Sequence, residues 1–187
     1  MDSQGRKLWE FNDGNVWHVE FADLDGDGRK KIVHSNAAGE ITVRDGKGKV
    51  ISKSRPKPYF SDFSLIRWPD AGGSERLLLA KDEAVWVFDA NAKVLAKFPA
   101  PDAGELGFGR GAFVVLKDKK RILATIVDFE NWNRSILYLH DLSGKLLYQE
   151  ILPESCRAIA VVPTEKLHEE SLMIGCSGKV LEYHIQR

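Results

Sequence analysis

Hydrophobic residues along this chain fall into short runs, which glycine, asparagine and aspartate residues bound. Between residues 12 and 56 there are four such runs, at 16–21, 32–34, 40–43 and 49–52. The runs are rich in β-branched and aromatic side chains, which is typical of strands, and no stretch shows a sustained helical period. The inner runs are apolar nearly throughout, which indicates strands buried on both faces. The pattern therefore predicts an all-β fold.

A phrase of seven residues recurs four times and sets the spacing of these runs. It has the form Asp-x-x-Gly-Lys/Arg-x-Leu/Ile, with Ala92 in place of the glycine in the third copy. The copies start at Asp2, Asp45, Asp89 and Asp141, so the steps are 43, 44 and 52 residues. A period in the forties built from short strands and turns is typical of the blades of a β-propeller.

These repeats predict a single β-propeller domain over residues 1–187, made of four four-stranded blades. The last repeat ends after its third strand, so residues 1–11 are expected to supply the missing edge strand and to close the ring. Two other arrangements remain open: two chains could form an eight-bladed ring, or the sequence could be a fragment of a larger propeller. The expected divisions are a closing strand at 1–11 and blades at 12–56, 57–101, 102–153 and 154–187.

The charge balance limits the classes of partner. The chain has 27 basic and 27 acidic side chains among 187 residues, so it has no electrostatic footprint for nucleic acid or an anionic membrane. No apolar run approaches the roughly 18 residues that are needed to span a bilayer. The first six residues lack the apolar core of a signal peptide, so we expect either a cytosolic chain or a mature segment whose leader has been removed.

Cys156 and Cys176 are the only two cysteines. Both fall in the last repeat, on the runs 156–163 and 170–177, which we expect to pair as neighbouring antiparallel strands. That register places the two sulfur atoms almost opposite each other. They are either two buried thiols or a cross-strand disulfide, and the disulfide would imply an oxidising compartment.

One acidic segment, residues 21–33, carries recognisable chemistry. Asp23, Asp25 and Asp27 stand at alternate positions, and the glycines between and after them allow a tight loop. Carboxylate oxygens turned inward suit a hard cation such as calcium. These residues resemble the loop of the FG-GAP or VCBS repeat, which joins the first two strands of a blade in integrin-type and many bacterial surface propellers. The resemblance implies an extracellular or periplasmic protein, with calcium bound by the three aspartates and the backbone carbonyl of Arg29.

Lys31 departs from that pattern, because the family has an acidic ligand at this position. A lysine removes one anionic ligand and adds a cation, so the affinity for calcium is expected to be reduced. Three states of the loop remain open: calcium bound at reduced affinity, a metal-free loop held by Lys31, Lys30 or Arg29, and a solvated acidic turn. The equivalent turns of the other repeats lack the alternating carboxylates.

The third repeat contains a candidate ligand-binding loop. Residues 128–135 lie between its second and third expected strands, and this insertion is taken to account for most of the 52-residue step. A long loop with an aromatic side chain among polar ones suits a sugar or a peptide, with a decorated surface turn as the alternative. The candidate ligand-binding residues are Glu130, Asn131, Trp132, Asn133 and Arg134.

The sequence contains no recognisable catalytic constellation, since its five histidines are scattered and no serine lies in a nucleophile elbow. The glycine-rich segment 104–111 is interpreted as a connector, because a β run rather than a helix follows it. We therefore expect a non-catalytic module that binds a protein or a glycan through loops on one face of the ring. The alternative is a lectin-like or lyase-like propeller that binds or degrades polysaccharide. It requires clustered basic or aromatic side chains at the channel mouth, for which His18 and Arg67 are candidates.

Overall fold

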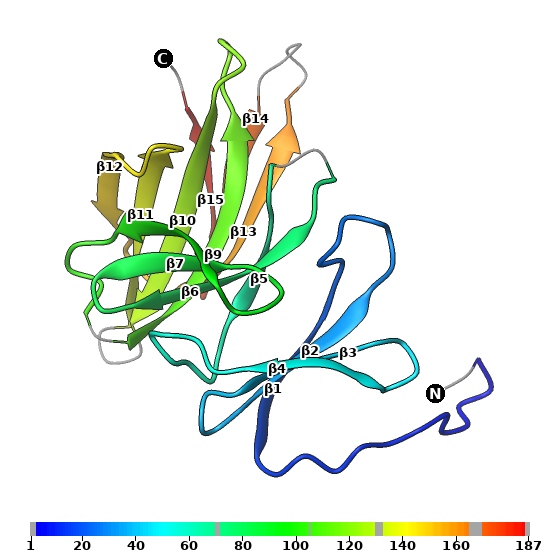
Figure 1. Ribbon diagram of the computed structural model, residues 1–187. Helices are drawn as coiled ribbons and strands as arrows, with labels where there is room; N and C mark the ends of the chain where they lie inside the picture. The colour runs from blue at the N-terminus through cyan, green and yellow to red at the C-terminus, as the bar shows by residue number, and fades with distance from the viewer. Residues whose placement is uncertain (1–2, 70–71, 105, 130–132, 165–169, 186–187) are drawn as a thin grey trace.

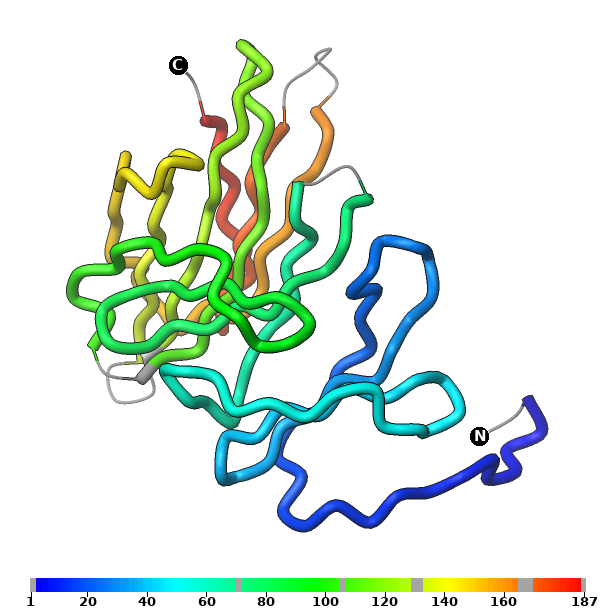
Figure 2. Tube along the Cα trace, viewed as in Figure 1, coloured from blue at the N-terminus to red at the C-terminus, as the bar shows by residue number. Residues whose placement is uncertain are grey.

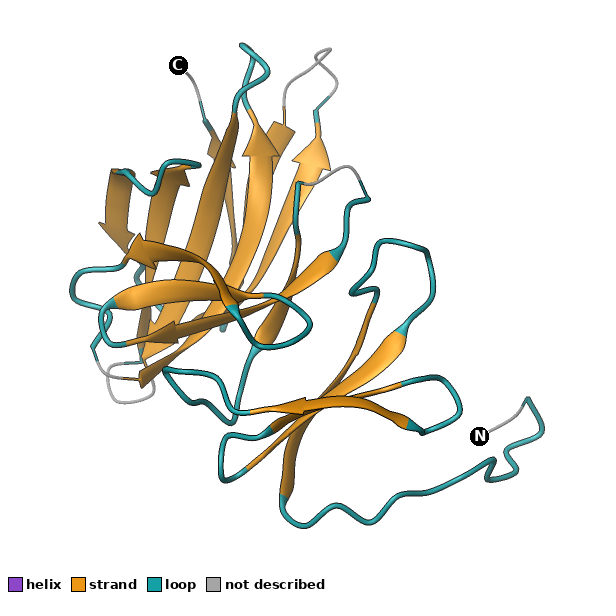
Figure 3. Ribbon diagram, in the orientation of Figure 1, coloured by secondary structure: helices purple, strands orange, loops and turns teal. Residues whose placement is uncertain are grey.

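The computed structural model describes residues 3–69, 72–104, 106–129, 133–164 and 170–185, and all the regular elements among them are β-strands (Figure 3). The all-β prediction is therefore confirmed. No helix in this part of the chain is long and apolar enough to cross a membrane. The strands are β1 (Val16–Ala22), β2 (Lys31–Asn36), β3 (Ile41–Arg44), β4 (Val50–Ser54), β5 (Ser64–Arg67), β6 (Glu75–Lys81), β7 (Ala84–Phe88), β8 (Val94–Pro99), β9 (Leu106–Val115), β10 (Arg121–Phe129), β11 (Arg134–Asp141), β12 (Leu146–Ile151), β13 (Cys156–Pro163), β14 (Glu170–Cys176) and β15 (Val180–His184).

The strands form four successive antiparallel meanders, β1–β4, β5–β8, β9–β12 and β13–β15. Figure 1 shows them following one another through the molecule, with the N-terminus at one end and the C-terminus at the other. The second and third meanders are joined into one sheet, because Ala80 and Lys81 of β6 pair with Gly107 and Leu106 of β9. The four-residue β5 pairs with β6 from Glu75 to Leu78 only, so the rest of that edge is available to β9.

The recurring aspartate phrase forms the turn that leads into the outer strand of a meander. Asp45 Oδ1 accepts the backbone N–H groups of Lys47 and Lys49, both at 2.9 Å. The phrases that start at Asp89 and Asp141 repeat this pair of hydrogen bonds. The fourth position has a positive φ in all three turns, whether it is occupied by Gly48, Ala92 or Gly144. The phrase recurs because its side chain and its glycine stabilise one local turn.

Each pair of neighbouring meanders encloses a hydrophobic core, and the alternation along the middle strands explains how. On β6, Leu77 and Leu79 face the first meander, whereas Leu78 and Ala80 face the third. On β10, residues 123 and 127 belong to the core shared with the second meander, and residues 122, 124 and 126 to the core shared with the fourth. The middle strands are thus apolar on both faces, as their near-continuous hydrophobic runs indicated.

The N-terminal segment does not occupy the place that was predicted for it. Residues 3–13 form no strand, and β15 pairs only with β14 among the described strands. Trp9 Nε1 instead donates to the carbonyl of Gly46 at 3.2 Å, and Phe11 stacks on His34 with ring centroids 5.0 Å apart. Arg44 lies 4.1 Å above the Phe11 ring.

The prediction that residues 1–11 close a ring of four blades is therefore not confirmed. The segment finds aromatic and cationic partners on the nearby β2–β3 face, while β15 lies at the opposite end of the molecule (Figure 2). Asp13 completes this contact, because its carboxylate accepts a hydrogen bond from Arg44 Nη2 at 2.5 Å. Among the described strands, the meanders follow one another in an arc, and neither the first nor the last meander packs on a further sheet.

The cysteines lie as their expected register requires. Cys156 and Cys176 are paired across β13 and β14, and their sulfur atoms form a disulfide. Of the two alternatives that the sequence left open, the structure therefore has the cross-strand disulfide. Cys156 is fully buried in the core between the third and fourth meanders.

The glycine-rich segment is mostly strand, so its interpretation as a connector was wrong. β9 begins at Leu106, and Gly107, Gly109 and Gly111 alternate along one of its faces. A Cβ on Gly109 would lie 3.0 Å from Leu78 Cδ2, and one on Gly111 would lie 2.9 Å from Leu78 Cδ1. These glycines are needed because β9 approaches the second meander more closely than a side chain would allow.

Candidate functional site

The acidic loop between β1 and β2 is docked on the start of β6 and on the connection that precedes it. The N–H of Glu75 donates to the carbonyl of Asp23 at 2.7 Å, and the Glu75 carboxylate accepts the N–H of Asp23 at 2.5 Å. Arg76 Nη1 donates to the carbonyl of Leu24 at 2.8 Å. These hydrogen bonds therefore link the first meander to the second, at the end of the molecule where the β1–β2 and β5–β6 connections lie.

The carboxylates of the loop are already engaged by groups of the chain itself. Asp23 accepts the N–H groups of Gly26, Asp27 and Gly28 at 2.9, 3.1 and 2.9 Å, and Asp25 forms an ion pair with Lys31. Partial desolvation raises the pKa of Asp23, but the three amides outweigh it and hold that pKa below its usual value. The ion pair with Lys31 is a contact that the lysine-held state of the loop requires. Calcium binding at reduced affinity stays a prediction, and in the described residues no three His, Cys, Asp or Glu side chains are grouped to hold a metal.

The expected ligand-binding loop of the third repeat is shorter than predicted. Asp128 pairs with Ser135 and Phe129 with Arg134, so only residues 130–133 connect β10 to β11. The extra residues of the 52-residue step instead lengthen the strands, since β9 has 10 residues and β10 has 9. Of the candidate residues, Glu130, Asn131 and Trp132 lie outside the described part of the chain, whereas Asn133 and Arg134 are exposed.

The end of this hairpin has a buried polar cluster that the sequence did not reveal. The Asp128 carboxylate accepts hydrogen bonds from Ser135 Oγ at 3.0 Å, Ser155 Oγ at 2.8 Å and Arg157 Nε at 2.6 Å. Ser135 Oγ in turn accepts the N–H of Cys156 at 2.8 Å. Because Asp128 is fully buried, this cluster ties the third meander to the fourth rather than presenting a carboxylate to a ligand.

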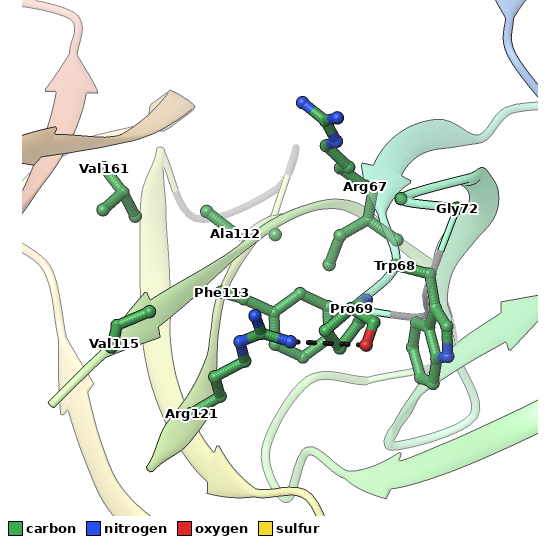
Figure 4. A pocket seen from close by; sticks show the side chains of 12 residues that line it. Arg67, Trp68, Pro69, Gly72, Ala112, Phe113, Val115, Arg121 and Val161 are labelled. Carbon is green, nitrogen blue, oxygen red and sulfur yellow. Dashed lines mark hydrogen bonds between the residues drawn. The ribbon is translucent and has the colours of Figure 1, made fainter. Parts of the chain in front are cut away.

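A pocket of about 540 Å³ opens at the other end of the same sheets, where the inner strands β5, β9 and β13 meet (Figure 4). Arg121, the first residue of β10, lines this pocket. Phe129, the last residue of β10, lies roughly 26 Å from Arg121 along the strand and pairs with Arg134. The structure therefore does not bring Arg134 to this pocket. The lining residues are Ile66, Arg67, Trp68, Pro69, Gly72, Gly73, Gly111, Ala112, Phe113, Val115, Arg121 and Val161.

The acidic loop supports one wall of this pocket. Gly72 lines the pocket, and a Cβ on Gly26 would lie 2.7 Å from its carbonyl oxygen. Gly26 has a positive φ of 72°, so the loop needs glycine here for its backbone as well as for the contact. The segment with the most distinctive sequence thus holds the β5–β6 connection in place.

His18 is not part of the pocket, although it lies on an inner strand. Its Nδ1 is 3.0 Å from Asp62 Oδ1 and its Nε2 is 3.2 Å from Glu20 Oε1. The hydrogen bond with Asp62 raises the pKa of His18 above its usual value, in spite of partial burial. Burial raises the pKa of Asp62, but the contact with His18 outweighs it and the net shift is downward. Of the two residues named for the channel mouth, only Arg67 lines the pocket.

Sequence reasoning missed most of the pocket because its walls come from three repeats. Arg121 and Phe113 lie on β10 and β9, more than 40 residues beyond Arg67, and no local motif links them. The available signal was weak: the inner strands of the second and third repeats end near Arg67, Trp68 and Phe113, but that of the fourth repeat ends in Val161, Val162 and Pro163.

Comparisons with known proteins identify the fold. No family model matches the chain, and no curated protein sequence matches it. Among solved structures, BBS1N in complex with ARL6DN, soaked with lead, has a TM-score of 0.55 at 14% identity over 92% of this chain. The mercury-soaked crystal of the same complex gives 0.56 at 15% identity over 96% of this chain, and the Dos1 propeller gives 0.50 at 14% over 92%.

These similarities show that the chain has a β-propeller fold. The chain spans only 54% and 59% of the two BBS1N chains and 47% of the Dos1 chain.

Proposed function

We propose that this chain is a non-catalytic binding module, in which a β-propeller scaffold presents a pocket for a segment of a protein partner. The observation that carries the proposal is the pocket at the meeting of β5, β9 and β13, whose walls combine two arginines with aromatic and aliphatic side chains. Its lining contains no histidine, carboxylate, serine or cysteine side chain, so the groups that most often act as acids, bases and nucleophiles are not among its described residues.

Two further points support a protein partner. A chain of the same fold, BBS1N, was crystallised in complex with ARL6DN. The FG-GAP or VCBS assignment is part of the same proposal, and it is supported by the acidic loop lying between the first two strands of a meander, where that family has it. Calcium at reduced affinity would then stabilise the loop that supports the pocket wall.

A library of random peptides displayed on phage tests this function. We expect enrichment of peptides on the native protein, and we expect those peptides to lose binding to Ala112→Phe, which fills the pocket from β9. Ala38→Phe is the matched control, because Ala38 is an exposed alanine in the β2–β3 connection and outside the pocket. Peptides that bind Ala112→Phe as well as the native protein would show that the pocket is not the binding site.

The two ends of the arc are the proposed contact between copies of the chain. On one face of β1, Trp17, Val19 and Phe21 are 66%, 45% and 61% exposed, and at the other end Val162 and Val180 are 45% and 63% exposed. Within the chain each neighbouring pair of sheets buries such faces against one another, so two copies placed end to end would extend the same packing.

Light scattering on the eluting protein tests this assembly. We expect a particle of twice the 21.0 kDa chain mass, and we expect the Trp17→Ser, Phe21→Ser double variant to elute as a monomer. Val50→Ser, Ile51→Ser is the matched control, since it removes exposed apolar side chains from the outer strand β4. A native protein that is monomeric at 100 µM would exclude the two-chain ring.

A further inference from the structure

We propose that the pocket takes an acidic peptide segment, in which Arg67 and Arg121 each bind a carboxylate while a neighbouring apolar side chain packs on Trp68 and Phe113. This inference rests on the proposed function and specifies the chemistry of the partner. Figure 4 shows the two arginines coming from different elements, Arg67 from the end of β5 and Arg121 from the start of β10.

Among the contacts of the described residues, both guanidinium groups keep N–H donors that are not used. Arg121 Nη1 donates to the carbonyl of Pro69 at 3.3 Å, which uses one of its five N–H donors. Arg67 packs over Gly73, where an added Cβ would lie 2.9 Å from its Nε. Both arginines are exposed, and no carboxylate of the described residues forms an ion pair with either of them. Guanidinium groups bind carboxylates in a planar, two-bond geometry, so a carboxylate is the ligand they suit best.

The surroundings of Arg121 add positive charge on this side of the pocket. The β9–β10 turn that precedes it contains Lys117, Lys119 and Lys120 against a single acid, Asp118. Asp118 is already paired with Lys120, at 2.6 Å between Oδ2 and Nζ. Glu170 lies at the same edge, where its carboxylate accepts the N–H of Val115 at 2.6 Å, so the basic groups that an acidic segment would approach here are Arg121 and the exposed Lys119.

The rest of the lining suits an apolar side chain. Trp68 and Phe113 meet edge to face, with ring centroids 5.5 Å apart and an interplanar angle of 85°. Ile66, Val115 and Val161 complete the apolar walls. A residue next to the carboxylate, such as leucine or phenylalanine, would be desolvated here and would add to the affinity.

An acidic sugar fits the same arginines less well. Sugar hydroxyl groups need acceptors as well as donors, and the described lining has no Ser, Thr, Asn, Gln, Asp or Glu side chain. The only other polar side-chain group in the lining is the indole N–H of Trp68, which is a donor. A peptide supplies the combination of carboxylate and apolar side chain that the pocket can accommodate.

Fluorescence anisotropy with three labelled probes tests the inference. The probes are an eight-residue peptide of alternating glutamate and leucine, the same peptide with glutamine for glutamate, and hexagalacturonate. We expect the glutamate peptide to bind, and Arg67→Gln and Arg121→Gln each to weaken it about tenfold or more, because each removes a charge-assisted hydrogen bond. Arg55→Gln is the matched control, an exposed arginine after β4, and is expected to change the affinity less than about twofold.

The outcomes separate this inference from the proposed function. If the glutamine peptide binds as well as the glutamate peptide and Ala112→Phe abolishes both, the module binds peptides but the carboxylate assignment is wrong. If the glutamate peptide binds equally to native protein, Arg67→Gln and Arg121→Gln, the arginines do not hold it and the inference is again overturned. If only hexagalacturonate binds, both the inference and the protein-binding function are wrong. Thermal melting of each variant verifies that it is folded, which is expected because both arginines are exposed.

Discussion

Gly26 in the acidic loop lies against the backbone of Gly72 in the β5–β6 connection: a Cβ on Gly26 would be 2.7 Å from the Gly72 carbonyl oxygen. Gly72 also lines the pocket, so this contact connects the acidic loop to the proposed binding site. The strand and turn patterns of a single repeat could not predict this contact, because the two glycines belong to different meanders.

Replacing Gly26 with alanine should lower the unfolding free energy in two ways, through the positive φ at this position and through the contact with Gly72. The positive φ of 72° costs an alanine about 1–2 kcal/mol, and the clash with Gly72 adds to that. Gly28→Ala is the control, because Gly28 has a φ of 79° but nothing within 4 Å of an added Cβ. We expect urea unfolding to show a larger loss of unfolding free energy for Gly26→Ala than for Gly28→Ala. Equal losses would mean that the contact with Gly72 is not needed.

Replacing Lys31 with aspartate should increase the dependence of stability on calcium. The change removes the ion pair with Asp25 and adds the acidic ligand that the FG-GAP pattern has at this position. If the affinity reaches that of extracellular calcium modules, 10 mM calcium should raise the unfolding free energy of Lys31→Asp by about 1–3 kcal/mol. Differential scanning calorimetry with calcium or with a chelator measures this.

Lys47→Asp is the control for that measurement, since it makes the same charge change in the exposed β3–β4 turn. The native protein should respond to calcium less than Lys31→Asp does. If neither protein responds, the loop does not bind calcium even with its acidic ligand restored, and the resemblance does not extend to metal binding.

The pair of His18 and Asp62 should add stability in a defined pH range. The pKa of His18 is raised in the folded state, so its contribution is complete below about pH 6.5 and is lost as the pH rises through the folded-state value. The pKa of Asp62 is lowered, so its contribution is complete above about pH 4 and is lost as the pH falls further. We expect the difference in unfolding free energy between native protein and His18→Gln to be largest near pH 5–6 and smaller at pH 8.

Other histidines make this comparison with a variant necessary. Burial lowers the pKa of His34 and of His140, so both favour the unfolded state as the pH falls below about 6.5. These two contributions cancel when native protein and His18→Gln are compared at each pH. A difference between the two proteins that does not change from pH 5 to pH 8 would contradict the assigned ion pair.

Asp128→Asn should destabilise the junction between the third and fourth meanders. The carboxylate accepts three hydrogen bonds in a fully buried position, and an amide would present its NH₂ group to donors on one side. We expect a loss of about 2–4 kcal/mol in unfolding free energy, measured with the disulfide intact. Asp118→Asn, in an exposed turn, should lose less than about 1 kcal/mol. Similar losses for both variants would mean that the buried cluster contributes no more than an exposed ion pair.

Much of the local structure could be predicted from the sequence. The aspartate phrase predicted the turn before an outer strand, because Asp45 forms its hydrogen bonds within four residues. The register of Cys156 and Cys176 could be predicted because both lie in one hairpin. The resemblance of the acidic loop located it correctly between two strands, although Lys31 is paired with Asp25 there.

The contacts between repeats could not be predicted in this way. Residues 1–11 carry the outer-strand phrase, yet Trp9 contacts the β3–β4 turn and Phe11 packs on the β2–β3 face, and neither lies beside β15. The extra length of the third repeat was assigned to a loop around Trp132, but β9 and β10 contain it as longer strands. The pocket depends on Arg67, Arg121 and Val161, which come together only after three meanders have stacked.

By itself, the sequence determined the β-strands, their turns and the pairing within each hairpin, because alternation and short-range hydrogen bonds act between residues close along the chain. The tertiary structure alone decided that Phe11 packs on His34, that Gly26 meets Gly72, and that two arginines share a pocket with Trp68 and Phe113. These features depend on how curved sheets pack on one another, and that packing is set by side-chain volumes and backbone approach among residues far apart in the chain.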